Sequence, residues 1–97
     1  MGSRSKKFGM TSQIRRAAVS IAANIAEGCG RRGNGESQRF LGIAGGSASE
    51  LEYHFALVHD LRFVTDTTLS HLNASVGEIK RMLASLIRKV EAERLAS

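Results

Sequence analysis

Apolar residues recur along this chain at the spacing of helices, in three separate stretches. The first stretch consists of Ile14, Ala18, Ile21 and Ile25, which step by 4, 3 and 4 residues. This spacing places them on one stripe of a helix. Thr11 or Ser12 can cap the start of that helix, and Gly28 is expected to end it.

A second helix is expected after the glycine-rich segment 28–35, with Asn34 as its cap and an end near Phe63. Its predicted buried stripe is Phe40, Ala44, Ala48, Leu51, Phe55 and Val58. Gly42 and Gly46 lie one turn apart within it, and each costs about 1 kcal/mol relative to Ala. We interpret this pair as a close contact with another helix; the alternative is a kink.

The third stretch has the most regular pattern. Asp66 is the predicted cap, and the apolar residues step by 3 and 4 without interruption: Leu69, Leu72, Val76, Ile79, Leu83, Leu86 and Val90. Met82 and Ile87 widen this seam, so the helix is expected to contact at least two neighbours.

These patterns predict an all-α, antiparallel (up-down) bundle with three long helices. No β-hairpin signal occurs, and the chain contains no proline. We assign residues 1–8 to a basic tail and residues 9–97 to a single helical domain. A chain of 97 residues buries a marginal core, which favours oligomerisation.

Lysine and arginine are concentrated at the two ends of the sequence. The net charge is +5, divided as +6 over residues 1–40, −4 over 41–79 and +3 over 80–97. This pattern suits a polyanion such as RNA or DNA, or pairing between the ends of one copy and the middle of another. The candidate phosphate contacts are Arg15, Arg16, Arg31, Arg32, Lys80, Arg81, Arg88 and Lys89. The alternative is an ordinary solvated surface.

No catalytic residue, metal or cofactor is predicted. Gly28–Gly33 matches G-x-G-x-x-G but follows a helix, whereas dinucleotide binding requires a preceding strand. Glu50 and His54 form a lone pair, too few ligands for a helical metal site. Cys29 has no histidine near it in sequence to act as a base.

The cellular compartment is predicted from weaker signals. A single cysteine fits a reducing cytoplasm, and no apolar run is long enough to span a bilayer. We therefore expect a cytoplasmic protein without membrane contact.

Three segments resemble a known family. Residues 11–28 (TSQIRRAAVSIAANIAEG), 46–53 (GSASELEY) and 81–90 (RMLASLIRKV) are similar to the four-helix bundle proteins encoded in bacterial 23S rRNA intervening sequences. The accessory protein of diversity-generating retroelements is similar too. The resemblance implies a four-helix bundle that assembles into a homopentamer with a basic surface and has no catalytic activity. In the retroelement relatives that surface engages nucleic acid and a reverse transcriptase.

The chain departs from the family pattern in three ways. Family members usually have proline where this chain has Ala22, and the loop is richer in glycine at Gly33 and Gly35. The family's opening helix, before the segment that begins at Thr11, has no counterpart. Either that helix lies outside this sequence or a neighbouring chain covers the apolar groove left open. We place the oligomer interface at Ile14, Ile21, Ile25, Leu83, Leu86 and Ile87.

Two functions remain open at this point. The first is a scaffold that binds nucleic acid through phosphates. Little base readout is expected, because Phe40, Tyr53, Phe55 and Phe63 fall within or beside the predicted buried helix. The second is a purely structural assembly or protein-partner scaffold.

Overall fold

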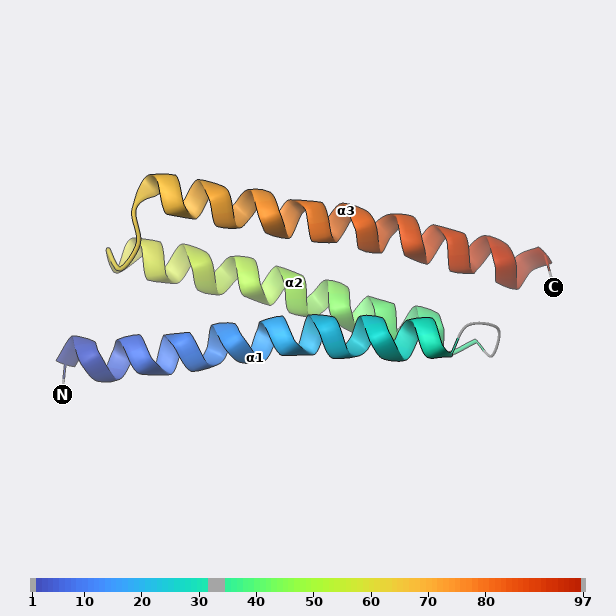
Figure 1. Ribbon diagram of the computed structural model, residues 1–97, viewed down its shortest axis with the longest axis horizontal. Coiled ribbons are helices and arrows are strands. Elements are labelled where there is room, and N and C mark those ends of the chain that lie inside the picture. The colour runs from blue at the N-terminus through green and yellow to red at the C-terminus, as the bar shows by residue number, and fades with distance from the viewer. Residues whose placement is uncertain (1, 32–34, 97) are drawn as a thin grey trace.

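Three helices account for most of the chain (Figure 1). The computed structural model describes residues 2–31 and 35–96, with side chains from Phe8 onward. Helix α1 spans Gly2–Gly30, α2 spans Ser37–Asp60 and α3 spans Asp66–Ala96. No strand occurs within these described ranges, so the predicted all-α class is confirmed. The described residues form three helices, and the count of four implied by the family resemblance is not confirmed.

The helices form a single layer. They run up, down and up, with α2 between α1 and α3 (Figure 1). Both outer helices pack on α2, and no backbone contact joins α1 to α3 among the described residues. The Cα atoms extend over 55 × 24 × 13 Å, so the molecule is elongated and flat.

Two apolar clusters hold the layer together. In the first, Ala17 and Ile21 of α1 share a core with α2 and with Val76 of α3. In the second, Leu41 and Ala44 of α2 pack with Leu83 and Val90 of α3. The fully buried residues of α3 therefore recur every seven positions, as the regular pattern in its sequence predicted.

Leu41, rather than Phe40, occupies the core position at the start of α2. Leu41 is 0% exposed, whereas Phe40 is only partly buried. The Phe40 ring lies beneath two guanidinium groups, with the Cζ atoms of Arg31 and Arg39 5.2 and 4.5 Å from its centroid. The assignment of Phe40 to the buried stripe was wrong because an aromatic ring can be covered by arginine instead of by the core.

Helix α1 is longer at both ends than the sequence suggested. It begins at Gly2 rather than at Thr11 or Ser12, so it includes residues 2–8, which were expected to form a tail. It also continues past Gly28 to Gly30. Both expected boundaries rested on residue types that favour helix ends, and such preferences are weak guides to where a helix begins or ends.

The close approach between helices occurs at Gly28. A Cβ atom on Gly28 would lie 2.9 Å from Leu41 Cγ and 3.2 Å from the Ser37 carbonyl oxygen. At Gly42 and Gly46 a Cβ atom would meet nothing within 4 Å. The predicted close contact of Gly42 and Gly46 with another helix is therefore not found within the described chain, and α2 is one continuous helix through both positions.

Helix α2 ends at Asp60, before Phe63, in a Schellman turn. Arg62 adopts a left-handed conformation with φ of 65°. Its N–H donates to the His59 carbonyl oxygen and the Phe63 N–H donates to that of Val58, both at 2.9 Å. This is the hydrogen-bond pattern of a helix stop that usually contains glycine.

The cap of α3 is Thr65 rather than Asp66. The Thr68 N–H donates to Thr65 Oγ1 at 3.1 Å, which is the bond expected of a cap residue. Asp66 is the first helical residue and its Oδ1 lies 2.6 Å from His59 Nε2. It thus ties the start of α3 to the end of α2. The cap predicted at Asn34, before α2, lies outside the described residues.

Candidate nucleic-acid interface

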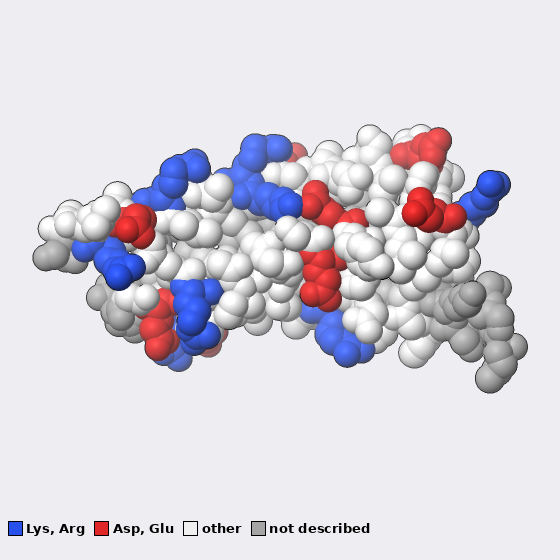
Figure 2. All heavy atoms as spheres, turned by 180° about the vertical axis from the view of Figure 1, so that it is seen from behind, with Lys and Arg blue, Asp and Glu red and all other residues white. Residues whose placement is uncertain are grey.

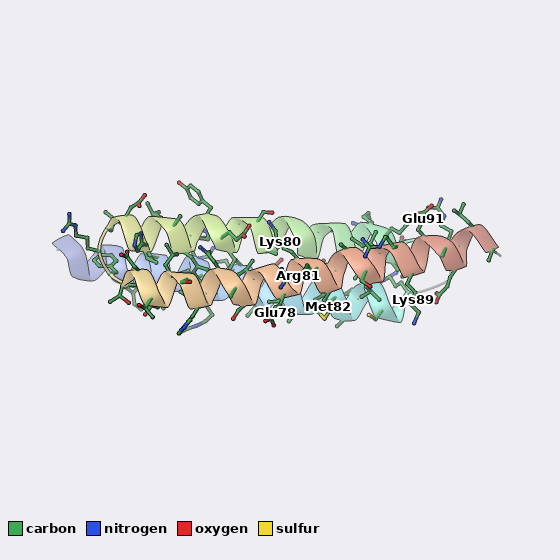
Figure 3. All side chains as sticks on the ribbon, turned by 90° about the horizontal axis from the view of Figure 1, so that it is seen from above. Glu78, Lys80, Arg81, Met82, Lys89 and Glu91 are labelled. Atoms are coloured by element: carbon green, nitrogen blue, oxygen red, sulfur yellow. The ribbon has the colours of Figure 1, made fainter. Side chains whose placement is uncertain are left out.

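Two arginines of α3 point away from the core without an acidic partner. Arg81 and Arg88 are exposed and lie two helical turns apart, which places them on one face. No hydrogen bond or ion pair joins either to another described residue. In Figure 3, where α3 lies in front of the other two helices, Arg81 lies on the side of α3 that faces the viewer, between Lys80 and Met82. We call Arg81 and Arg88 the α3 ridge.

The other two basic residues predicted on α3 lie elsewhere around the helix. Lys80 projects toward α2 (Figure 3), and its Nζ is 2.5 Å from Glu52 Oε1. Lys89 projects from the opposite side of α3, together with Glu78 and Met82 (Figure 3). The four basic residues of α3 therefore do not form one surface.

Arg31 is already matched by two carboxylates. Its guanidinium lies 3.1 Å from Glu27 Oε2 and 3.1 Å from Glu36 Oε2, and it also covers the Phe40 ring. A phosphate would have to compete with both acids for this side chain. Arg32, the other loop residue predicted to bind phosphate, lies outside the described residues.

Arg15 and Arg16 are exposed on α1. Arg16 Nη2 donates to Ser12 Oγ at 3.3 Å, and neither arginine forms an ion pair with a described acid. They are available to an anion, but they lie on a different helix from the α3 ridge. Two separate basic sites are therefore present on one chain.

The described side chains carry much less net charge than the whole sequence. They include ten Lys and Arg and all nine Asp and Glu, a net charge of +1. The rest of the excess comes from Arg4, Lys6, Lys7 and Arg32. On the face seen in Figure 2, basic groups gather mainly over the half that holds the end of α3 and the start of α2. An anion would therefore meet local clusters of basic side chains and not a uniformly basic surface.

Sequence reasoning missed three polar or aromatic features of this surface. Arg39 is exposed above Phe40, and Arg94 donates to Gln38 Oε1 at 2.5 Å across α3 and α2. Tyr53 is 64% exposed and lies edge-on to His54. An aromatic ring is thus available for stacking, contrary to the expectation that all four would be covered. The sequence held one signal of this exposure: around α2, Tyr53 lies on the side opposite Leu51 and Phe55, which face the core.

The predicted interface residues divide into two groups. Ile21 and Leu83 are buried within the chain itself. Ile14, Ile25, Leu86 and Ile87 are partly buried at the edges of the two clusters. Only the second group retains surface that another chain could cover.

The acidic and histidine residues of α2 form separate pairwise contacts and do not form one cluster. Glu50 lies 3.5 Å from His54, Glu52 contacts Lys80, and His59 contacts Asp66. Within the described part of the chain, no three His, Cys, Asp or Glu residues are placed to hold a metal ion. Cys29 is exposed and unbonded to another cysteine. Among the described helices, none combines the length and hydrophobicity needed to cross a membrane.

Comparison with known proteins links this fold to one family. Residues 2–85 match the sequence profile of the 23S rRNA-intervening sequence proteins. The structure is similar to that of a protein of unknown function from the S23 ribosomal protein family of Bacteroides thetaiotaomicron, with a TM-score of 0.75 and 32% identity. The match covers 80% of this chain and 72% of that one. No curated protein matches the chain.

Proposed function

Because this chain belongs to the family of 23S rRNA-intervening sequence proteins, we propose that it is a non-enzymatic, self-associating helical scaffold that binds RNA or DNA through phosphates. The observation that carries the nucleic-acid part is the α3 ridge. Arg81 and Arg88 have no acidic partner in the described chain, whereas Arg31 has two and Lys80 has one. A free guanidinium gains more from a phosphate than one that must first leave a carboxylate.

Phosphate contact, rather than base readout, is the expected mode. Arginine side chains on the outside of one helix meet the nucleic-acid backbone first, and such contacts position a protein without reading sequence. Tyr53 offers one stacking surface, but it belongs to α2, whereas the α3 ridge belongs to α3. Binding should therefore be weakly selective for sequence.

Self-association is supported by the shape of the chain. A single layer of helices leaves one side of α1 and α3 without a second layer, whereas domains generally bury apolar faces between two layers. The homopentamer and the reverse-transcriptase partner implied by the family resemblance stay predictions. A purely structural scaffold is the competing function.

The first prediction concerns salt dependence. A labelled RNA of mixed sequence is titrated with protein between about 50 and 200 mM salt, where the logarithm of the affinity should fall by about 0.7–0.9 per phosphate contacted. Arg81→Gln combined with Arg88→Gln should weaken binding about tenfold or more and flatten this slope. Helicity should be unchanged, because both residues are exposed.

The control has the same net charge. Arg31→Gln combined with Lys80→Gln also removes two positive charges, but from residues that already face carboxylates. Equal weakening by both double variants would mean that only overall charge matters and that the α3 ridge is not a site. Absence of binding by the parent at low salt would leave the purely structural scaffold.

A further inference from the structure

The side of α2 that is turned away from the core carries two groups on which a flat ring can stack. Arg39, Gly46 and Tyr53 recur every seven residues and are all exposed, so they lie along one face of the helix. Gly42, one turn before Gly46, is exposed too. We call Arg39, Gly42, Gly46 and Tyr53 the α2 outer face.

Arg39 forms one end of this face. Its Cζ lies 4.5 Å from the centroid of the Phe40 ring, and no ion pair joins it to a described acid. The contact with Phe40 restrains the guanidinium while the residue stays exposed. Planar guanidinium groups stack on nucleobases as well as on aromatic side chains. This end of the α2 outer face therefore offers a positively charged stacking surface.

Tyr53 supplies an aromatic ring at the other end, and it is 64% exposed. Its contact with His54 has an interplanar angle of 64°, so His54 does not stack in parallel on the ring. Between the two ends, Gly42 and Gly46 have no side chain, and a Cβ atom at either would meet nothing within 4 Å. The two stacking groups are fourteen residues apart in sequence, a span of about 21 Å along the helix.

The α3 ridge runs beside this face. Gln38 of α2 contacts Glu91 of α3, and Glu52 contacts Lys80. Because α3 is antiparallel to α2, Arg81 and Arg88 lie between these two contacts along the axis (Figure 1). Arg88 precedes Glu91 by three residues and is therefore its neighbour on the surface of α3.

The acids near Tyr53 already have partners within the chain. Glu50 lies 3.5 Å from His54, and Glu52 contacts Lys80. The unpaired cations Arg39, Arg81 and Arg88 are thus the charged groups that a phosphate backbone would meet first on this part of the surface.

We infer that the α2 outer face and the α3 ridge together bind single-stranded nucleic acid in preference to a duplex. Unpaired bases stack on Tyr53 and Arg39, and the phosphates contact Arg81 and Arg88. In a duplex the bases stack on one another inside the helix and cannot be splayed onto these groups. At a rise of about 3.4 Å per stacked nucleotide, the span between the two stacking groups corresponds to roughly six nucleotides.

The inference rests on the proposed nucleic-acid binding and adds a strand preference to it. Every base has a π-face, so stacking on Tyr53 and Arg39 tolerates any sequence. The preference for single strands is therefore compatible with the weak sequence selectivity expected of phosphate contacts.

Tyrosine fluorescence tests the stacking directly. Tyr53 is the only tyrosine of the chain, which contains no tryptophan. Titration with an unlabelled single-stranded RNA of mixed sequence should quench this fluorescence, whereas the same RNA annealed to its complement should leave it nearly unchanged. N-acetyltyrosinamide in the same solutions corrects for absorption by the RNA. Binding of the single strand without quenching would overturn the inference.

Substitutions measured by anisotropy of a labelled strand give a second test. Tyr53→Ala should weaken single-strand binding about fivefold or more and leave duplex binding unchanged, while Tyr53→Phe should stay within about twofold of the parent. Arg39→Lys keeps the charge but removes the planar guanidinium, so it should weaken single-strand binding without changing its salt dependence. Val19→Ala, at an exposed apolar residue of α1, is the control and should bind as the parent does.

The outcomes separate this inference from the proposed function. Equal affinity for single strand and duplex, or a helical Tyr53→Ala variant that binds single strands as tightly as the parent, would overturn the strand preference and leave phosphate binding by the α3 ridge in place. Absence of binding to either form at low salt would refute both.

Discussion

Glycine plays opposite parts at two positions of this chain. At Gly28 the missing Cβ lets α1 approach Leu41 and the Ser37 carbonyl. At Gly46 the side-chain position is open, so glycine there only lowers the helix propensity of α2. Residue type alone could not separate these cases, because the distinction depends on which helix lies opposite.

The two glycines give a matched pair of substitutions. Gly28→Ala should lower the free energy of unfolding by about 1–3 kcal/mol, because the new methyl group meets Leu41 and backbone. Gly46→Ala should raise it by about 0.5–1 kcal/mol, as alanine is the better helix former. Urea unfolding followed by circular dichroism measures both. Weaker self-association of the Gly46→Ala variant, without a loss of helicity, would instead mark α2 as a contact surface between copies.

At the scale of the helix, the apolar repeats predicted which segments are helical, and the ends were predicted less well. The seven-residue recurrence of Val76, Leu83 and Val90 required no tertiary information. The end of α2 could not be predicted in this way, because Arg62 adopts a left-handed conformation that its side chain does not favour. The α3 cap fell one residue from the prediction, since Thr65 and Asp66 are both good cap residues.

Arg62 also gives a stability prediction. A non-glycine residue in the left-handed region costs about 1 kcal/mol. Arg62→Gly should therefore raise the free energy of unfolding by about 0.5–1 kcal/mol, and the Schellman hydrogen bonds of the turn should persist. Thermal unfolding at fixed protein concentration measures the change. A loss of stability would mean that contacts of the Arg62 side chain stabilise the turn by more than its left-handed backbone conformation destabilises it.

At the scale of the whole molecule, the candidate site was the least predictable part. Counting charges along the sequence could not show that Glu27 and Glu36 meet Arg31, or that Lys80 meets Glu52 across two helices. Nor could it show that Arg81 and Lys89 point in different directions. Such pairings depend on helix register, which the apolar pattern fixes only to within a turn.

Substitutions at two neighbouring residues of α3 should have different effects on folding. Leu83 is 2% exposed in the second cluster, so Leu83→Asp should unfold the chain, since an unpaired buried charge costs several kcal/mol. Met82→Asp places the same charge on a side chain that is 51% exposed, so the chain should stay helical. Circular dichroism together with sedimentation distinguishes the two outcomes. A folded Leu83→Asp monomer would place Leu83 in an intermolecular interface, as the sequence alone suggested.

The central position of α2 has a consequence for the order of folding. Among the described residues, every backbone contact between helices joins elements that are adjacent in sequence, and no backbone contact joins α1 to α3. Such local topology requires few long loop closures and favours rapid folding. Either outer helix can detach while the other stays docked, much as terminal repeats fray from a solenoid. The chain has no obligatory first hairpin: the α1–α2 and α2–α3 pairs are alternative nuclei, and α2 belongs to both.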